Sequence, residues 1–185
     1  MHADLVERAM RGDQEAFASL AADWVDRCYA LAYRVLRDHH AAQDASQQAL
    51  LGAWRDLPRL RDAERFEQWL YRLVLNACYQ LARTERRSRA RVVALHNDDQ
   101  GSTSPDIARS VAARDELERA FRSLTPEQRS VVVLHHHLGY PLTEIAATLA
   151  IPVGTARSRL HYAVRQLRTV LDDGLVTATS EERTA

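Results

Sequence analysis

The sequence predicts an all-α protein made of two small helical domains joined by a flexible linker. Helix-forming residues are abundant, whereas the 185-residue chain has only six Gly and five Pro. Apolar residues recur with helical spacing on both sides of ALHNDDQGSTSPD, a polar stretch over residues 94–106 without periodicity. The expected divisions are a first domain over 1–92, a linker over 93–112, a second domain with a helix-turn-helix over 113–171, and a disordered tail over 172–185.

The first domain is expected to contain helices near residues 4–20, 23–37 and 41–56, followed by a longer one that starts near residue 65. In RFEQWLYRLVLNACYQLAR, the side chains of Phe66, Leu70, Leu73 and Ala77 fall on one apolar stripe. This stripe predicts that the longer helix packs against the earlier ones.

The second domain contains clear signals for where its helices begin and end. Thr125 precedes Pro126 and lies three residues before Gln128, which is the pattern of an N-cap with a capping box. Gly139 suits the residue just after that helix, and Pro141 precedes the next one. In the last helix, one core-facing stripe is expected from Leu160, Val164, Leu167 and Leu171.

Composition excludes several classes of protein. No apolar run is long enough to span a membrane, and the charged N-terminus lacks a signal peptide's apolar core, so a cytoplasmic protein without membrane insertion is expected. Cys28 and Cys78 belong to no metal-binding or CxxC pattern and are expected to be buried thiols, with a disulfide switch as the alternative.

Enzymatic chemistry is also unexpected. The sequence has no nucleophile elbow, P-loop, HExxH or dinucleotide fingerprint, so we predict no catalytic residues, cofactor or metal. Three successive histidines, residues 135–137, point about 100° apart on a helix, so they do not form one tetrahedral site.

Charge is unevenly distributed along a chain whose net charge is zero. Residues 1–56 carry nine acids and six arginines, whereas residues 83–91 carry five arginines and one acid. Residues 145–171 carry four arginines and no acid. This pattern indicates a docking surface in the first half and two separate basic surfaces.

LTEIAATLAIPVGTARSRL, residues 142–160, predicts two short helices separated at Ile151-Pro152. Ile145, Ala146 and Leu149 would pack the first helix, and Leu160 would anchor the second. The outer face of the second helix then offers arginines and small polar groups without a carboxylate, as a helix in the DNA major groove requires. Its members are Thr155, Arg157, Ser158, His161, Tyr162 and Arg165. The alternative is an amphipathic hairpin with a solvated basic face.

The segment LTPEQRSVVVLHHHLGYPLTEIAATLAIPVGTARSRLHYAVRQLR resembles the C-terminal DNA-binding domain of bacterial RNA polymerase sigma factors of the extracytoplasmic-function (ECF) type, group 4 of the sigma-70 family. In that family this domain reads the minus-thirty-five promoter element. DASQQALLGAW, residues 44–54, resembles the helix that docks on the polymerase clamp. RFEQWLYRLVLNACYQLARTERR, residues 65–87, resembles the helix that reads and melts the minus-ten element.

The resemblance implies roles for further residues. The minus-ten contacts would be Arg61, Asp62, Arg65, Phe66, Asn76, Arg83, Arg86 and Arg87. Core polymerase would be bound by Asp44, Gln47, Gln48 and Trp54. Ala41, Gln43, Ala45 and Gln48 stand where the family commonly has more acidic or larger residues, which leaves the polar contacts of this helix in doubt. Gln80 stands where Asp is frequent, and Ala150 where Gly is common.

The function implied is that of a transcription initiation factor. Its partners would be core RNA polymerase, through the beta-prime clamp helices and the beta flap, promoter DNA, and an anti-sigma factor. The alternative is a stand-alone helix-turn-helix regulator that binds operator DNA as a dimer. The basic, Asn-bearing helix of the first domain argues against this alternative.

Overall fold

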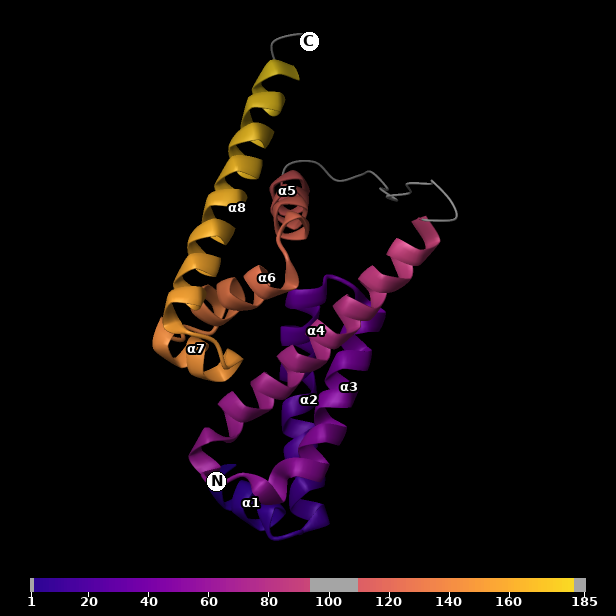
Figure 1. Ribbon diagram of the computed structural model, residues 1–185, viewed down its shortest axis with the longest axis vertical. Helices are drawn as coiled ribbons and strands as arrows, with labels where there is room; N and C mark the ends of the chain where they lie inside the picture. The colour runs from indigo at the N-terminus through magenta and orange to yellow at the C-terminus, as the bar shows by residue number, and fades with distance from the viewer. Residues whose placement is uncertain (1, 94–109, 182–185) are drawn as a thin grey trace.

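The computed structural model describes residues 2–93 and 110–181, and all regular structure within these ranges is helical, which confirms the all-α prediction (Figure 1). Residues 94–109, most of the expected linker, lie outside the described part. The elements are α1 His2–Met10, α2 Gln14–Leu36, α3 His39–Asp56, the 3-10 turns η1 Leu57–Arg59 and η2 Ala63–Arg65, α4 Phe66–Val93, α5 Ser110–Ser123, α6 Pro126–Val132, the π-helical turn η3 Val133–His137, α7 Leu142–Leu149 and α8 Val153–Glu181.

The first domain is a bundle in which α3 packs against both α2 and α4, and α1 packs against α2 (Figure 1). The buried stripe of α3 consists of small residues, with Ala42, Ala45, Ala49 and Ala53 all at most 2% exposed. Side chains of this size let neighbouring helices approach closely. The alanine at position 45, where a larger residue is common in sigma factors, therefore belongs to the packing of the bundle.

The expected helix over residues 4–20 is wrong, because the chain turns at Gly12 and a new helix begins at Gln14. Gly12 has φ +93°, a conformation that side chains with a Cβ rarely adopt. Asp13 is the N-cap of α2, since its carboxylate accepts hydrogen bonds from the backbone N–H groups of Glu15 and Ala16, each at 3.0 Å. No such break separates residues 20 and 23, so α2 is continuous where two helices were expected.

The signals in the second domain are confirmed. The Thr125 hydroxyl accepts the Gln128 N–H at 3.2 Å, and the Gln128 side chain accepts the Thr125 N–H at 2.8 Å, which completes the capping box. Gly139 follows the π turn with φ +75°. The expectation of disorder from residue 172 is wrong for most of that segment, since α8 continues to Glu181. In α8 the fully buried residues are Ala156 and Ala163, and two members of the predicted stripe, Leu160 and Leu167, are half-buried and pack against the core.

Ala150 occupies the turn between α7 and α8 in the left-handed conformation, with φ 52° and ψ 47°. Glycine reaches this conformation without the steric cost that an alanine Cβ adds. We therefore expect Ala150→Gly to raise the free energy of unfolding by roughly 0.5–1 kcal/mol in urea titrations. Ala147→Gly, on the exposed side of α7, is the control and is expected to lower it by a similar amount. A loss of stability with Ala150→Gly would contradict this account of the turn.

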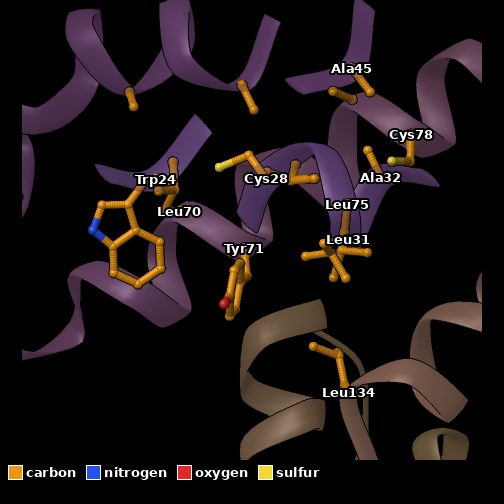
Figure 2. Packing of buried hydrophobic residues seen from close by; sticks show 14 of the residues in the cluster. Trp24, Cys28, Leu31, Ala32, Ala45, Leu70, Tyr71, Leu75, Cys78 and Leu134 are labelled. Carbon is orange, nitrogen blue, oxygen red and sulfur yellow. The ribbon is translucent and has the colours of Figure 1, made fainter. Parts of the chain in front are cut away.

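One hydrophobic core extends from the first domain into the second. Figure 2 shows Leu31 of α2 and the α4 residues Tyr71 and Leu75 above Leu134 of the π turn, and all four side chains are at most 4% exposed. α4 is therefore buried on two sides, one against the first domain and one against the second. The sequence predicted one buried stripe on this helix. The two halves of the chain are packed against each other in this structure.

Cys28 and Cys78 are both free and fully buried in this core (Figure 2). Burial raises the pKa of each thiol to about 12, so both remain protonated and unreactive at neutral pH. The expectation of buried free thiols is confirmed. Within the described ranges, no helix combines the length and the apolar character that a membrane span requires.

Candidate nucleic-acid interface

One side of α4 is exposed and carries arginine and amide side chains. Arg72, Asn76, Gln80 and Arg83 recur every three or four residues, so they share one face of the helix, and all four are exposed. Arg65, in the η2 turn just before α4, is also exposed and lies seven residues, or about two helical turns, before Arg72, and this set of five is called the α4 face below. Arg72 was not predicted, although its position one turn before Asn76 was the signal that could have identified it.

Two further arginines, Arg86 and Arg87, continue this basic surface toward the end of α4 and are exposed. Guanidinium groups bind phosphate oxygens, and amide groups such as that of Asn76 donate to and accept from base edges. The surface therefore offers both backbone and base contacts to a nucleic acid strand.

The loop before α4 is held in place by Asp62. Its carboxylate accepts the Glu64 N–H at 3.0 Å and forms an ion pair with Arg65 at 3.2 Å. The Arg61 and Arg65 side chains are exposed, so the loop presents cations beside the start of the α4 face. An ordered loop at a helix start suits recognition, because fewer conformations must be lost on binding.

Phe66 is 5% exposed and belongs to the core, unlike the other predicted minus-ten residues. Its ring packs at an angle of 80° against Trp24, with centroids 5.7 Å apart. The neighbouring Trp69 is half-buried and lies 6.0 Å from Phe66. In this conformation the Phe66 ring packs in the core and is not exposed to a nucleic acid strand.

The helix-turn-helix is formed by α7 and α8. Ile145 and Ala146 are buried as expected, and Leu149 and Leu160 are half-buried against the core. The predicted outer face of α8 is exposed, apart from half-buried Thr155. Its members Arg157, His161 and Arg165, together with Arg168 one turn further on, border a groove of about 500 Å³ along α8. Arg168 was not predicted.

Among the residues that the structure describes, this groove is lined by three arginines and one carboxylate, that of Asp172 at its far end. Tyr162 is 59% exposed, and its ring lies 5.7 Å from that of His161 in an edge-to-face arrangement. The Ser158 hydroxyl donates to the Thr155 carbonyl at 3.0 Å, so its lone pairs remain available to accept. The outer face of α8 therefore carries several cations with polar and aromatic groups between them, which suits contacts with DNA phosphates and base edges.

A separate surface lies on α3, where the predicted polymerase-binding residues Asp44, Gln47 and Gln48 are exposed. Trp54 is 43% exposed and packs edge-on against Phe17 of α2, with ring centroids 4.9 Å apart. Leu51, at 63% exposed, lies between them on the same helical stripe and was missed by the sequence reasoning. Exposed apolar side chains flanked by amides and one carboxylate form a surface suited to a protein partner.

The three histidines of the π turn do not converge. The His135 ring donates from Nδ1 to the Tyr140 carbonyl at 3.0 Å, whereas His136 and His137 are exposed. No cluster of three or more His, Cys, Asp or Glu side chains that could hold a metal ion occurs among the residues that the structure describes.

Comparison with known families gives two matches. Residues 20–88 match Sigma-70 region 2, and residues 114–167 match Sigma-70, region 4. These matches include the α4 face, the α3 surface and the helix-turn-helix.

Individual proteins agree with the family matches. The chain is 36% identical over 168 residues to the ECF RNA polymerase sigma factor SigE of Mycolicibacterium smegmatis, covering 86% of this chain and 64% of that protein. It is 31% identical over 169 residues to the RNA polymerase sigma-H factor of Pseudomonas aeruginosa, covering 86% and 88%. For SigW of Bacillus subtilis, also named an ECF sigma factor, the identity is 28% over 91% of this chain and 95% of that protein.

Two solved structures share the fold. CnrH in complex with the cytosolic domain of CnrY has a TM-score of 0.64 and 25% identity, over 93% of this chain and 97% of that one. RpoE in complex with the anti-sigma factor NepR from Bartonella quintana has a TM-score of 0.65 and 20% identity, over 84% and 96%. The chain belongs to the ECF RNA polymerase sigma factors of the sigma-70 family.

Proposed function

We propose that this chain is a transcription initiation factor that binds core RNA polymerase and directs it to specific promoters. The observation that carries the proposal is that one chain presents two separate basic recognition surfaces, the α4 face and the outer face of α8, together with the exposed α3 surface. An operator-binding regulator requires only the helix-turn-helix, so the other two surfaces disfavour that alternative.

The division of labour follows from the chemistry of each surface. The α4 face, with Asn76 and the loop at Arg61 and Asp62, would bind the minus-ten element, because amides and arginines can hold unstacked bases and their backbone. The outer face of α8, with Arg157 and Arg165, would read the minus-thirty-five element in the major groove.

The α3 surface would dock on the beta-prime clamp helices of core polymerase. Leu51 and Trp54 would supply buried apolar contact, and Asp44, Gln47 and Gln48 would supply hydrogen bonds at its border. The second domain would contact the beta flap. The protein would act in the cytoplasm beside the polymerase, which performs the chemistry of RNA synthesis, and the chain itself would need no cofactor.

An anti-sigma factor is a further proposed partner. RpoE was solved in complex with the anti-sigma factor NepR, and CnrH with the cytosolic domain of CnrY. These proteins share the fold of this chain, so we propose that a protein of this kind regulates it.

The direct test is run-off transcription with purified bacterial core polymerase on DNA from upstream of the chain's own gene, with and without the chain. A discrete transcript that requires the chain is the expected result. Salt-sensitive binding of duplex DNA by the chain alone, without any transcript, would favour the operator-binding regulator instead.

A further inference from the structure

A cavity of about 320 Å³ lies where the end of α2 meets α5 and the π turn η3, and it is called the α2–η3 cavity below. Its polar lining consists of Arg34 and the C-cap residue Arg37 on α2, Glu118 on α5, and His136 and His137 on η3. The rest of the lining is apolar and is made by Leu117, Phe121, Val132 and Val133. A pocket of this size with a few polar groups on apolar walls is typical of a small-molecule site.

The α2–η3 cavity borders a cluster of four arginines. Burial lowers the pKa of Arg37, and the positive charges of Arg122 and Arg34 lower it further. Burial also lowers the pKa of Arg129, which is 9% exposed, to about 10, and the charges of Arg37 and Arg122 add to this effect. These guanidinium groups stay charged at neutral pH and repel one another, and Glu118 is the one carboxylate among the described residues that line the cavity. A bound anion would relieve this repulsion.

Arg37 has a donor that lacks an acceptor within the described part of the chain. Its Nη2 forms an ion pair with Glu118, and its guanidinium lies 5.3 Å from the Tyr33 ring centroid and 5.8 Å from that of Phe121. Nε is buried and has no hydrogen-bond partner among those residues. A buried donor without an acceptor is unfavourable, so an acceptor oxygen held against Arg37 would be stabilised.

The donors around the cavity favour a phosphate over a carboxylate. Arg34 donates one of its five N–H groups to the Ala30 carbonyl, at 3.1 Å. The π turn places both His136 and His137 on the cavity, and such turns are frequent at functional sites. A phosphate monoester brings three acceptor oxygens and a charge of about −1.5 to −2 at pH 7, whereas a carboxylate brings two oxygens and one charge. Guanidinium groups also pair with phosphate through two parallel hydrogen bonds.

A second cavity, of about 350 Å³, adjoins the first because Arg34, Val133 and His137 line both. It contains the carboxylate of Glu67, which accepts a hydrogen bond from the Tyr140 hydroxyl at 3.1 Å. This carboxylate repels a phosphate, whereas the arginine cluster attracts it, so the phosphate belongs in the α2–η3 cavity.

We propose that the α2–η3 cavity binds a small organic phosphomonoester. Arg34 and Arg37 hold the phosphate, with His136 and His137 as further donors, and the organic group packs against Phe121 and the neighbouring valines. The site shares no residue with the α4 face, the α3 surface or the outer face of α8, so this inference does not rest on the proposed function.

The test is an NMR titration of the full chain with phenyl phosphate, which joins a phosphate to one aromatic ring. Saturable amide shifts are expected in residues 34–37, 117–121 and 132–137, with a Kd of at most about 1 mM. Benzoate, which carries a carboxylate on the same ring, is expected to bind about tenfold more weakly, and equal binding would contradict the choice of phosphate. Shifts confined to residues 157–168 would place the phosphate on the outer face of α8 and overturn the proposal, as would the absence of any saturable shift.

Two variants with the same change of charge test the role of Arg34. Arg34→Gln removes a guanidinium from the cavity and is expected to raise the Kd for phenyl phosphate about tenfold. Arg119→Gln removes an exposed arginine of α5 that does not line the cavity, and it should bind like the wild type. If both variants lose affinity equally, the attraction depends on net charge and the cavity is not the site.

Circular dichroism checks that Arg34→Gln keeps the fold, because this side chain is half-buried and bonded to its own helix. His136→Gln is the second variant, since this histidine is exposed and its replacement leaves the core intact. It is expected to raise the Kd severalfold. A folded chain with either change that binds phenyl phosphate as tightly as the wild type would refute the proposed site.

Discussion

Replacing Trp24 by alanine is expected to lower the free energy of unfolding by about 3–5 kcal/mol. The Trp24 side chain is 5% exposed and lies in the first domain beside Leu70 (Figure 2). Its ring packs edge-on against Phe66 at 5.7 Å and Tyr71 at 5.9 Å, and the Arg27 guanidinium lies 4.8 Å from its centroid on the outer side. Truncation removes these contacts and leaves a cavity that the surrounding side chains fill only in part.

The measurement is urea unfolding followed by circular dichroism. Trp54→Ala is the matched control, because this tryptophan is 43% exposed and should cost less than about 1 kcal/mol. For binding to core polymerase the order should be reversed. Trp54→Ala, which stays folded, should lose affinity because its side chain belongs to the α3 surface. Equal destabilisation by the two changes would contradict the assignment of Trp24 to the core and of Trp54 to a docking surface.

Local signals explain which parts of the fold could be predicted from the sequence. The capping box at Thr125 and Gln128 uses atoms three residues apart, so it is determined by nearby sequence alone. The signal for the break at Gly12 was also local. It was missed because the apolar residues before and after the break keep the spacing of one continuous helix. The left-handed turn at Ala150 was harder to predict, since alanine is otherwise a strong helix former and the one hint was that glycine is common at this position in the family.

Contacts between distant segments were not predictable in the same way. Tyr71 and Leu75 are buried because the second domain covers a second side of α4, and no periodicity within α4 specifies that partner. Arg129 lies in a motif that the sequence identified, yet its bond to the Val35 carbonyl joins residues 94 positions apart. The exposure of the predicted DNA-binding residues was easier to predict, because an arginine-rich helix face without acids is a property of its own sequence.

Arg157→Ala is expected to weaken binding of the polymerase holoenzyme to a minus-thirty-five element by about 10- to 100-fold. Arg157 is exposed at the start of α8, on the side that borders the basic groove with His161 and Arg165. A guanidinium there can pair with a guanine edge or with a phosphate, and alanine replaces neither contact. The fold should be unaffected, because no buried atom is removed.

Salt titrations on matched promoters distinguish the two contacts of Arg157. A base contact predicts a loss that is largest on the wild-type element and small on a substituted one, whereas a phosphate contact predicts an equal loss on both and a salt slope smaller by about one. Arg11→Ala changes the net charge equally, but Arg11 lies in the turn that follows α1, away from α8 (Figure 1), so this variant should bind like the wild type. If Arg11→Ala weakens binding as much as Arg157→Ala, the effect is one of overall charge, and α8 does not read DNA as proposed.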